Sequence, residues 1–178
     1  MTETDLVDES PPCESYQGKG KHLALTIPFL ILVVMITLYL ASINLIFSII
    51  YIGFYVATNI FQAYCCVYQE CPYVGKYCPA VVCLYPANFL AQLSFYKNME
   101  RTEKKFNTFV ALAELSLLCF AVFPLFFLFQ LGILYLVGYV IFILIYAFLF
   151  LWFICPNCAI NDTCPGGIAS QKLHKQSK

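Results

Sequence analysis

Cysteine thiols are the groups in this chain best suited to chemistry, and ten of them occur in 178 residues. Three lie in the segment CPNCAINDTCPGG, residues 155–167, directly after a long apolar run. Cys155 and Cys158 form a C-x2-C pair, a spacing that lets two thiolates from one tight turn bind the same metal ion. The pair therefore predicts half of a four-thiolate metal site.

Proline follows cysteine at four positions, namely Cys71, Cys78, Cys155 and Cys164. Proline fixes φ and withholds one backbone N–H, and a Cys-Pro step also closes one bacterial iron–sulfur motif. The spacings differ from the bacterial and the plant-type ferredoxin patterns, so no ferredoxin family is assigned. Because thiolates suit zinc, cuprous copper and iron–sulfur clusters alike, we expect a metal centre that is either an iron–sulfur cluster or zinc.

The expected ligands come from two short segments of similar pattern. CPYVGKYCPAVV, residues 71–82, and CAINDTCPGGIA, residues 158–169, each place a second cysteine six or seven positions after a first and follow it with proline. Each segment also follows an apolar run, which indicates an internal duplication. The expected metal ligands are Cys71, Cys78, Cys155, Cys158 and Cys164, and Cys66 and Cys83 are the second-choice candidates.

The segments that position these thiols are strongly apolar, because the chain is 61% hydrophobic and 11% charged, with a mean hydropathy of +0.77. No Asp, Glu, Lys or Arg occurs in residues 23–69 or in residues 115–161, and each run is 47 residues long. A membrane-spanning helix needs about 20 residues, so each run predicts a hairpin of two helices. The expected fold is an all-α integral membrane protein with four transmembrane helices in two hairpins.

Polar or flexible residues mark the expected reversals, which are Ser42 and Asn44 in the first run and Gln130 and Gly132 in the second. The expected spans are 24–42, 45–66, 107–129 and 132–154, with Pro28 and Pro124 inside spans as packing features. The chain is expected to divide into a disordered tail (1–22), transmembrane hairpin 1 (23–66), cysteine loop 1 (67–86), an interfacial amphipathic helix (87–105), transmembrane hairpin 2 (106–154), cysteine loop 2 (155–169) and a second tail (170–178).

The basic residues predict the orientation through the positive-inside rule. All ten fall on one side of the four expected spans: Lys19, Lys21, Lys76, Lys97, Arg101, Lys104, Lys105, Lys172, Lys175 and Lys178. That side is expected to be cytoplasmic, with both termini and both cysteine loops. Since disulfides seldom persist in a reducing cytosol, metal binding or catalysis by these cysteines is favoured over disulfide cross-links.

Other roles for the cysteines stay open. Thiols beside the ends of spans, such as Cys65, Cys66, Cys83 and Cys155, are placed as in palmitoylated proteins. Thiol–disulfide exchange at the CPNC pair is another alternative. Cys119, inside the third expected span, is interpreted as a small hydrophobe.

Glu114 is the one charged residue expected at membrane depth, and an acid there marks a candidate intramembrane polar site. The alternative is that Glu114 reaches the basic residues near 101–105 or stays protonated. In residues 87–105, the stripe of Phe89, Leu90, Leu93 and Tyr96 predicts a helix lying along the headgroups.

The function expected from these features is that of a membrane protein with a cytoplasmic thiolate metal centre, such as an iron–sulfur electron-transfer or accessory subunit of a membrane complex. A scaffold stapled by zinc and a palmitoylated or thiol-redox protein are the alternatives. The bilayer and a membrane protein partner or second copy are the expected contacts, and zero net charge disfavours nucleic acid. The chain has no P-loop, G-x-G-x-x-G or H-E-x-x-H motif, and His22 and His174 are expected to be solvated.

Overall fold

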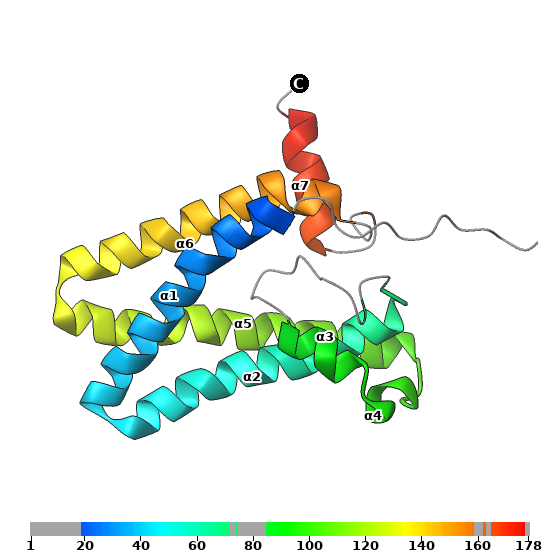
Figure 1. Cartoon of the computed structure of the whole chain (residues 1–178), viewed down its shortest axis with the longest axis horizontal. Coiled ribbons are helices and arrows are strands. Elements are labelled where there is room, and N and C mark those ends of the chain that lie inside the picture. Colours follow the sequence, from blue (N-terminus) through cyan, green and yellow to red (C-terminus); the bar gives the residue numbers. More distant parts are fainter. Residues whose placement is uncertain (1–18, 72–73, 75–84, 159–161, 163–164, 177–178) are drawn as a thin grey trace, which may run out of the picture.

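Figure 1 shows the computed structural model of the chain, in which every regular element among the described residues is a helix. The described residues are 19–71, 74, 85–158, 162 and 165–176. The elements are α1 (Lys19–Ile43), α2 (Leu45–Tyr68), α3 (Tyr85–Ala91), α4 (Ser94–Lys97), α5 (Glu103–Leu131), α6 (Ile133–Phe153), the 3₁₀ helix η1 (Cys155–Asn157) and α7 (Pro165–Gln176).

Four helices in the described part are long and apolar enough to cross a membrane, and they are α1, α2, α5 and α6 with its continuation to Asn157. These helices confirm the all-helical fold and the expected number of helices long and apolar enough to span a membrane. Three of these helices, α1, α2 and α5, are longer than the expected spans, whereas α6 is one residue shorter at each end. The largest extensions are the first turns of α1 and α5, which carry charged residues and continue the helix beyond the apolar stretch.

The two hairpins reverse at the residues that the sequence indicated. Asn44 has an extended backbone and caps α2, where its side chain accepts a 2.9 Å hydrogen bond from the N–H of Ile46. Gly132 separates α5 from α6 with a φ of 142°, a conformation that side-chain-bearing residues rarely adopt. One residue therefore suffices for each reversal.

The four long helices form a ring in which α2 packs on α5, α1 packs on α2 and α6, and α5 packs on α6. Both hairpin turns lie at one end of the bundle, and α3, α4 and α7 lie at the other (Figure 1). At that second end, α3 and α4 pack on α2, whereas η1 and α7 pack on α6. The ends of α2 and α6, which lead into the two cysteine segments, are thus at the same end of the molecule.

Aromatic rings fill much of the interior between these helices. Tyr51 of α2 stacks on Phe120 of α5, and Phe29 of α1 stacks on Tyr146 of α6, each with 4.5 Å between ring centroids. The outer surface instead exposes large apolar side chains such as Leu134 and Leu144. A bilayer is the solvent that suits such a surface, because lipid chains are as apolar as these side chains.

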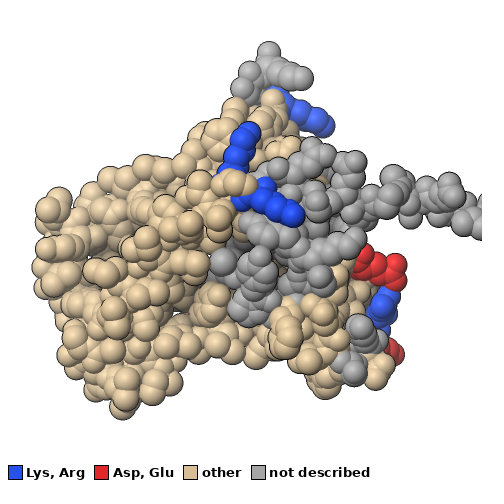
Figure 2. Space-filling view, in the orientation of Figure 1, with Lys and Arg blue, Asp and Glu red and all other residues tan. Residues whose placement is uncertain are grey.

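Charged side chains gather at the end opposite the turns (Figure 2). Helix α1 begins at Lys19 and helix α5 begins at Glu103. Helix α7 contains Lys172 and Lys175. This distribution follows the order of the spans, since both hairpins start and finish at that end.

Three segments differ from the sequence-based division of the chain. The single helix expected over 87–105 is instead two short helices, α3 and α4, and the residues from Glu103 onward belong to α5. The expected second tail is largely the helix α7, and the described part of the first tail is the start of α1. Packing against α2 and α6 orders these ends, and a local pattern does not report such contacts.

Candidate metal centre

Cys71 is positioned by the way that α2 ends. The N–H of Cys71 donates to the carbonyl oxygen of Cys66 at 3.0 Å, and the N–H of Glu70 donates to Val67 at 3.3 Å. This pair of bonds is a Schellman motif, and Glu70 takes the left-handed conformation that the motif requires, with a φ of 49°. The motif turns the chain back, so Cys71 is buried, with 6% of its surface exposed.

Cys155 and Cys158 flank a 3₁₀ turn that prolongs α6. The N–H of Cys158 donates to the carbonyl oxygen of Cys155 at 3.2 Å, and the Asn157 side chain donates to Phe153 at 3.0 Å. Pro156 fits this turn because the first residues of a helix need no N–H donor. Cys155 is 8% exposed and Cys158 is half-buried. The turn therefore has the compact form that a C-x2-C ligand pair requires.

The remaining described cysteines are Cys65, Cys66 and Cys119. Cys65 and Cys66 are half-buried near the end of α2, and the thiol of Cys65 donates to the carbonyl oxygen of Phe61 at 3.5 Å. Cys119 is half-buried in α5, within the membrane-spanning stretch.

The described residues contain only part of the expected ligand set. Among them, no group of three or more His, Cys, Asp or Glu side chains is arranged to hold a metal ion. Cys78, Cys83 and Cys164 lie outside the described residues. The structure thus brings Cys71 and the Cys155–Cys158 pair to the same end of the bundle, after helices that belong to different hairpins.

Both histidines are less exposed than the sequence indicated. His22 is only 3% exposed, its ring contacts Phe150 of α6, and its Nε2 lies 3.4 Å from Oγ1 of Thr26. His174 of α7 packs its ring on Trp152, with 4.4 Å between centroids. The prediction that both are solvated is therefore wrong. The spacing of His22 from Thr26 and Phe29, four and seven residues, continues the buried stripe of α1 and was the available signal.

Glu114 lies on the outer surface of α5 and is exposed. Two basic residues near the start of α5 form ion pairs with other carboxylates: Arg101 pairs with Glu70, and Lys105 pairs with Glu100 at 2.6 Å. Nine residues of helix, about 13 Å, separate Lys105 from Glu114, which exceeds the reach of the two side chains. The carboxyl group therefore lies on the outer face of the bundle, with none of these cations beside it.

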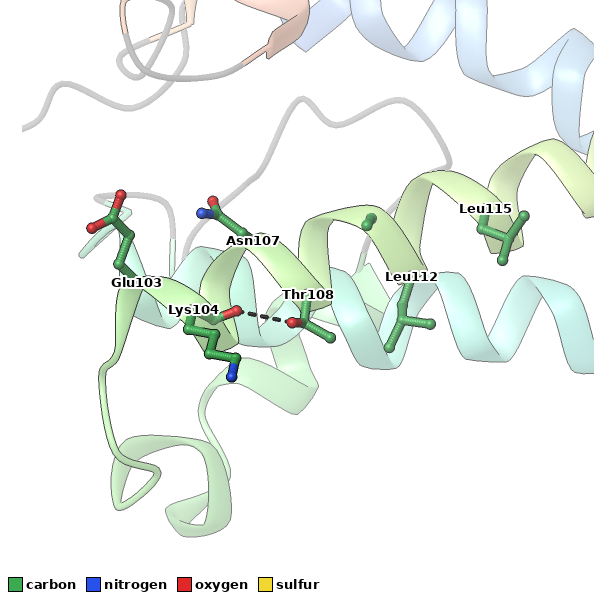
Figure 3. A pocket seen from close by; sticks show the side chains of 7 residues that line it. Glu103, Lys104, Asn107, Thr108, Leu112 and Leu115 are labelled. Carbon is green, nitrogen blue, oxygen red and sulfur yellow. Dashed lines mark hydrogen bonds between the residues drawn. The ribbon is translucent and has the colours of Figure 1, made fainter.

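A shallow groove follows the same helix nearer its charged end (Figure 3). Its lining comes from α5 alone, and the hydroxyl of Thr108 is bonded to the carbonyl oxygen of Lys104 at 2.9 Å. The lining changes from polar to apolar along the helix: Glu103, Lys104, Asn107, Thr108, Ala111, Leu112 and Leu115. A surface made by one helix has no convergent polar groups and offers no catalytic arrangement.

Asn59 is a polar residue within an apolar helix, and the sequence analysis did not predict it as a candidate site. It is buried in α2, and its amide nitrogen donates to the carbonyl oxygen of Tyr55 at 2.7 Å. Its Oδ1 has no hydrogen-bond partner among the described residues. An apolar run hides such a residue, because one amide changes its average hydropathy little.

No protein family, no curated protein sequence and no solved structure matches this chain.

Proposed function

We propose that the charged end of the bundle holds a metal centre ligated by cysteine thiolates from both hairpins. The proposed centre is an iron–sulfur cluster, and the protein is a small electron-transfer or accessory subunit of a larger membrane complex. The observation that supports this most is the placement of Cys71 and the Cys155–Cys158 pair at the same end of the bundle, after α2 and α6 respectively (Figure 1).

The Cys155–Cys158 turn is the proposed nucleus of the centre. Its two cysteines are three residues apart on one hydrogen-bonded turn, which is the arrangement by which a C-x2-C pair supplies two ligands. Cys71 supplies a third thiolate from the other hairpin. The further proposed ligands are Cys78 and Cys164, and Cys66 and Cys83 are the second-choice candidates.

A structural zinc site is the second candidate, because the described parts of the two cysteine-bearing ends pack on different hairpins. The helices α3 and α4 pack on α2, whereas η1 and α7 pack on α6. A tetrahedral zinc ion bound by thiolates from both would join them and would stabilise the folded bundle. In that case the protein is a scaffold, and its role lies in its partners.

Acylation is less well supported for the buried cysteines. An acyl group needs an accessible thiol, and Cys71 and Cys155 are both buried. Of the described cysteines beside the spans, Cys65 and Cys66 are the more accessible and remain the candidates for palmitoylation.

The proposed orientation places the charged end, both termini and the cysteine segments in the cytoplasm. The clustering of described Lys and Arg side chains at that end supports it (Figure 2). The proposed duplication has the same support as the shared site, since each hairpin finishes at that end and is followed by a Cys-Pro segment.

The proposal is tested by anaerobic purification of the protein in detergent, followed by elemental analysis and visible spectroscopy on one sample. Iron with acid-labile sulfide and broad visible absorption would support the electron-transfer role. Stoichiometric zinc without colour would support the scaffold instead. A sample with neither metal would overturn both.

A further inference from the structure

The helices α3 and α4 are held alongside the final turns of α2. The small side chains of Ala87 and Ala91 are buried, which lets α3 approach α2 closely. The hydroxyl of Tyr96 in α4 donates to the carbonyl oxygen of Ile60 at 3.3 Å. Just beyond α4, the carbonyl oxygen of Glu100 accepts a 3.0 Å hydrogen bond from the hydroxyl of Tyr64. These contacts fix the level of the segment along α2.

That level lies near the edge of the hydrocarbon layer. Ile60 follows Leu45, the first residue of α2, by fifteen residues, which corresponds to about 22 Å along the helix. A bilayer core is about 30 Å thick. If the hairpin turn marks one edge of the core, Ile60 lies within the core, a few ångströms from the opposite edge. Because the Tyr96 hydroxyl bonds the carbonyl oxygen of Ile60, α4 lies no farther from Ile60 than the length of a tyrosine side chain.

Among the described side chains of residues 85–97, which lie outside the four spans, the exposed ones are apolar except for Gln92. Phe89 is 67% exposed, Leu93 is 43% exposed and Phe95 is 68% exposed. Basic side chains follow soon after, since Arg101 lies between α4 and α5 and Lys105 lies in the first turn of α5. Both are exposed at the surface in ion pairs, with Glu70 and Glu100 respectively. Bulky apolar residues with adjacent cations are the composition of segments that insert at the boundary of headgroups and acyl chains.

We propose that α3 and α4 form a wedge inserted into one leaflet, beside α2, at the charged end of the bundle. The ligand of this surface is the lipid boundary itself, with Phe89, Leu93 and Phe95 among the first acyl carbons. The exposed apolar face of α2, which includes Val56 and Ile60, continues into this surface and supports lipid as the occupant. The wedge is independent of the proposed metal centre.

The wedge is tested by tryptophan fluorescence, because Trp152 is the one tryptophan in the chain. Phe95→Trp in a Trp152→Phe background is reconstituted as the full chain in phosphatidylcholine–phosphatidylserine vesicles. Lipids brominated near the headgroup end of the acyl chain are expected to quench its emission, and aqueous iodide is not. Phe89→Trp is expected to behave in the same way and provides a second readout if Phe95→Trp does not fold.

The matched control is Thr102→Trp, just before α5, where the native side chain makes no capping hydrogen bond. Thr102 is exposed and precedes a helix of 29 residues, about 43 Å long, so it lies outside the hydrocarbon core. Its emission is expected to respond to iodide. Iodide quenching of both folded phenylalanine variants would overturn the wedge, and so would protection from both quenchers, which would indicate a covering protein surface.

Discussion

The hydroxyl of Tyr139 in α6 donates a 2.9 Å hydrogen bond to the carbonyl oxygen of Ala121 in α5, three residues before Pro124. Pro124 has no N–H to donate to the carbonyl oxygen of Phe120, four residues earlier, so the bond from Tyr139 reaches the carbonyl next to the one that loses its helical donor. Contacts from neighbouring helices are what make a proline tolerable inside a membrane-spanning helix. The two helices of the second hairpin are therefore tied together at the proline.

Replacing Tyr139 by phenylalanine is expected to destabilise the bundle by about 1 kcal/mol, because it removes this one hydrogen bond and little packing. Thermal unfolding in detergent, followed by circular dichroism, measures the effect. The control is Tyr135→Phe on the same helix, where the native side chain is exposed and has no hydrogen bond within the described residues. Equal unfolding midpoints for the two variants would contradict the assignment.

The second prediction concerns the effect on stability of replacing Gly132 in the turn between α5 and α6. Alanine at this position must adopt a φ of 142°, so Gly132→Ala is expected to cost about 1–3 kcal/mol. Gly138→Ala is the matched control, because a Cβ there meets no atom within 4 Å and the residue lies inside α6. That control is expected to be neutral or slightly stabilising. A harmless Gly132→Ala, measured by the same unfolding assay, would show that the hairpin does not depend on this conformation.

The ion pair between Glu100 and Lys105, which lies outside the spans, is expected to make the stability of the protein weakly dependent on pH. A hydrogen bond from Lys105, and then its charge, lower the pKa of the Glu100 carboxyl group below its ordinary value. The stabilisation is therefore fully present above the ordinary glutamate pKa and is lost as the pH falls through the lowered one. Because both side chains are exposed, Glu100→Gln is expected to change the unfolding midpoint little at neutral pH. A large loss there would mean that the pair is structurally important.

The proposed orientation predicts that epitope tags at the two termini lie on the same, cytoplasmic side. The reason is the sequence pattern, in which all ten Lys and Arg residues fall on one side of the four expected spans. Protease treatment of sealed right-side-out membranes is expected to spare both tags, and permeabilisation is expected to remove both. Loss of one tag alone before permeabilisation would require an odd number of spans.

The sequence predicted the spans and their reversals well, because charge-free runs and single polar residues act locally. Asn44 and Gly132 are recognisable from residue type alone. The break between α3 and α4 and the burial of His22 were not predicted, since both depend on contacts with helices distant in the chain, such as the bond from Tyr96 to Ile60. The same holds for the side of α5 on which Glu114 lies.

The candidate site was predicted in part. Spacing identified the Cys155–Cys158 pair, and the structure places it on a hydrogen-bonded turn. The Schellman motif that buries Cys71 was not foreseen, because Glu70 occupies the position where glycine is the usual signal. The ligand set itself stays a prediction.

The most direct measurement is the metal content per mole of protein in three parallel anaerobic preparations: wild type, the Cys155→Ser/Cys158→Ser double variant and Cys119→Ala. A shared thiolate centre predicts that wild type and Cys119→Ala carry the same stoichiometric iron or zinc, because Cys119 lies within a span. The double variant is expected to lose it while remaining helical by circular dichroism. Full retention of metal in a folded double variant, or no metal in the wild type, would contradict the centre.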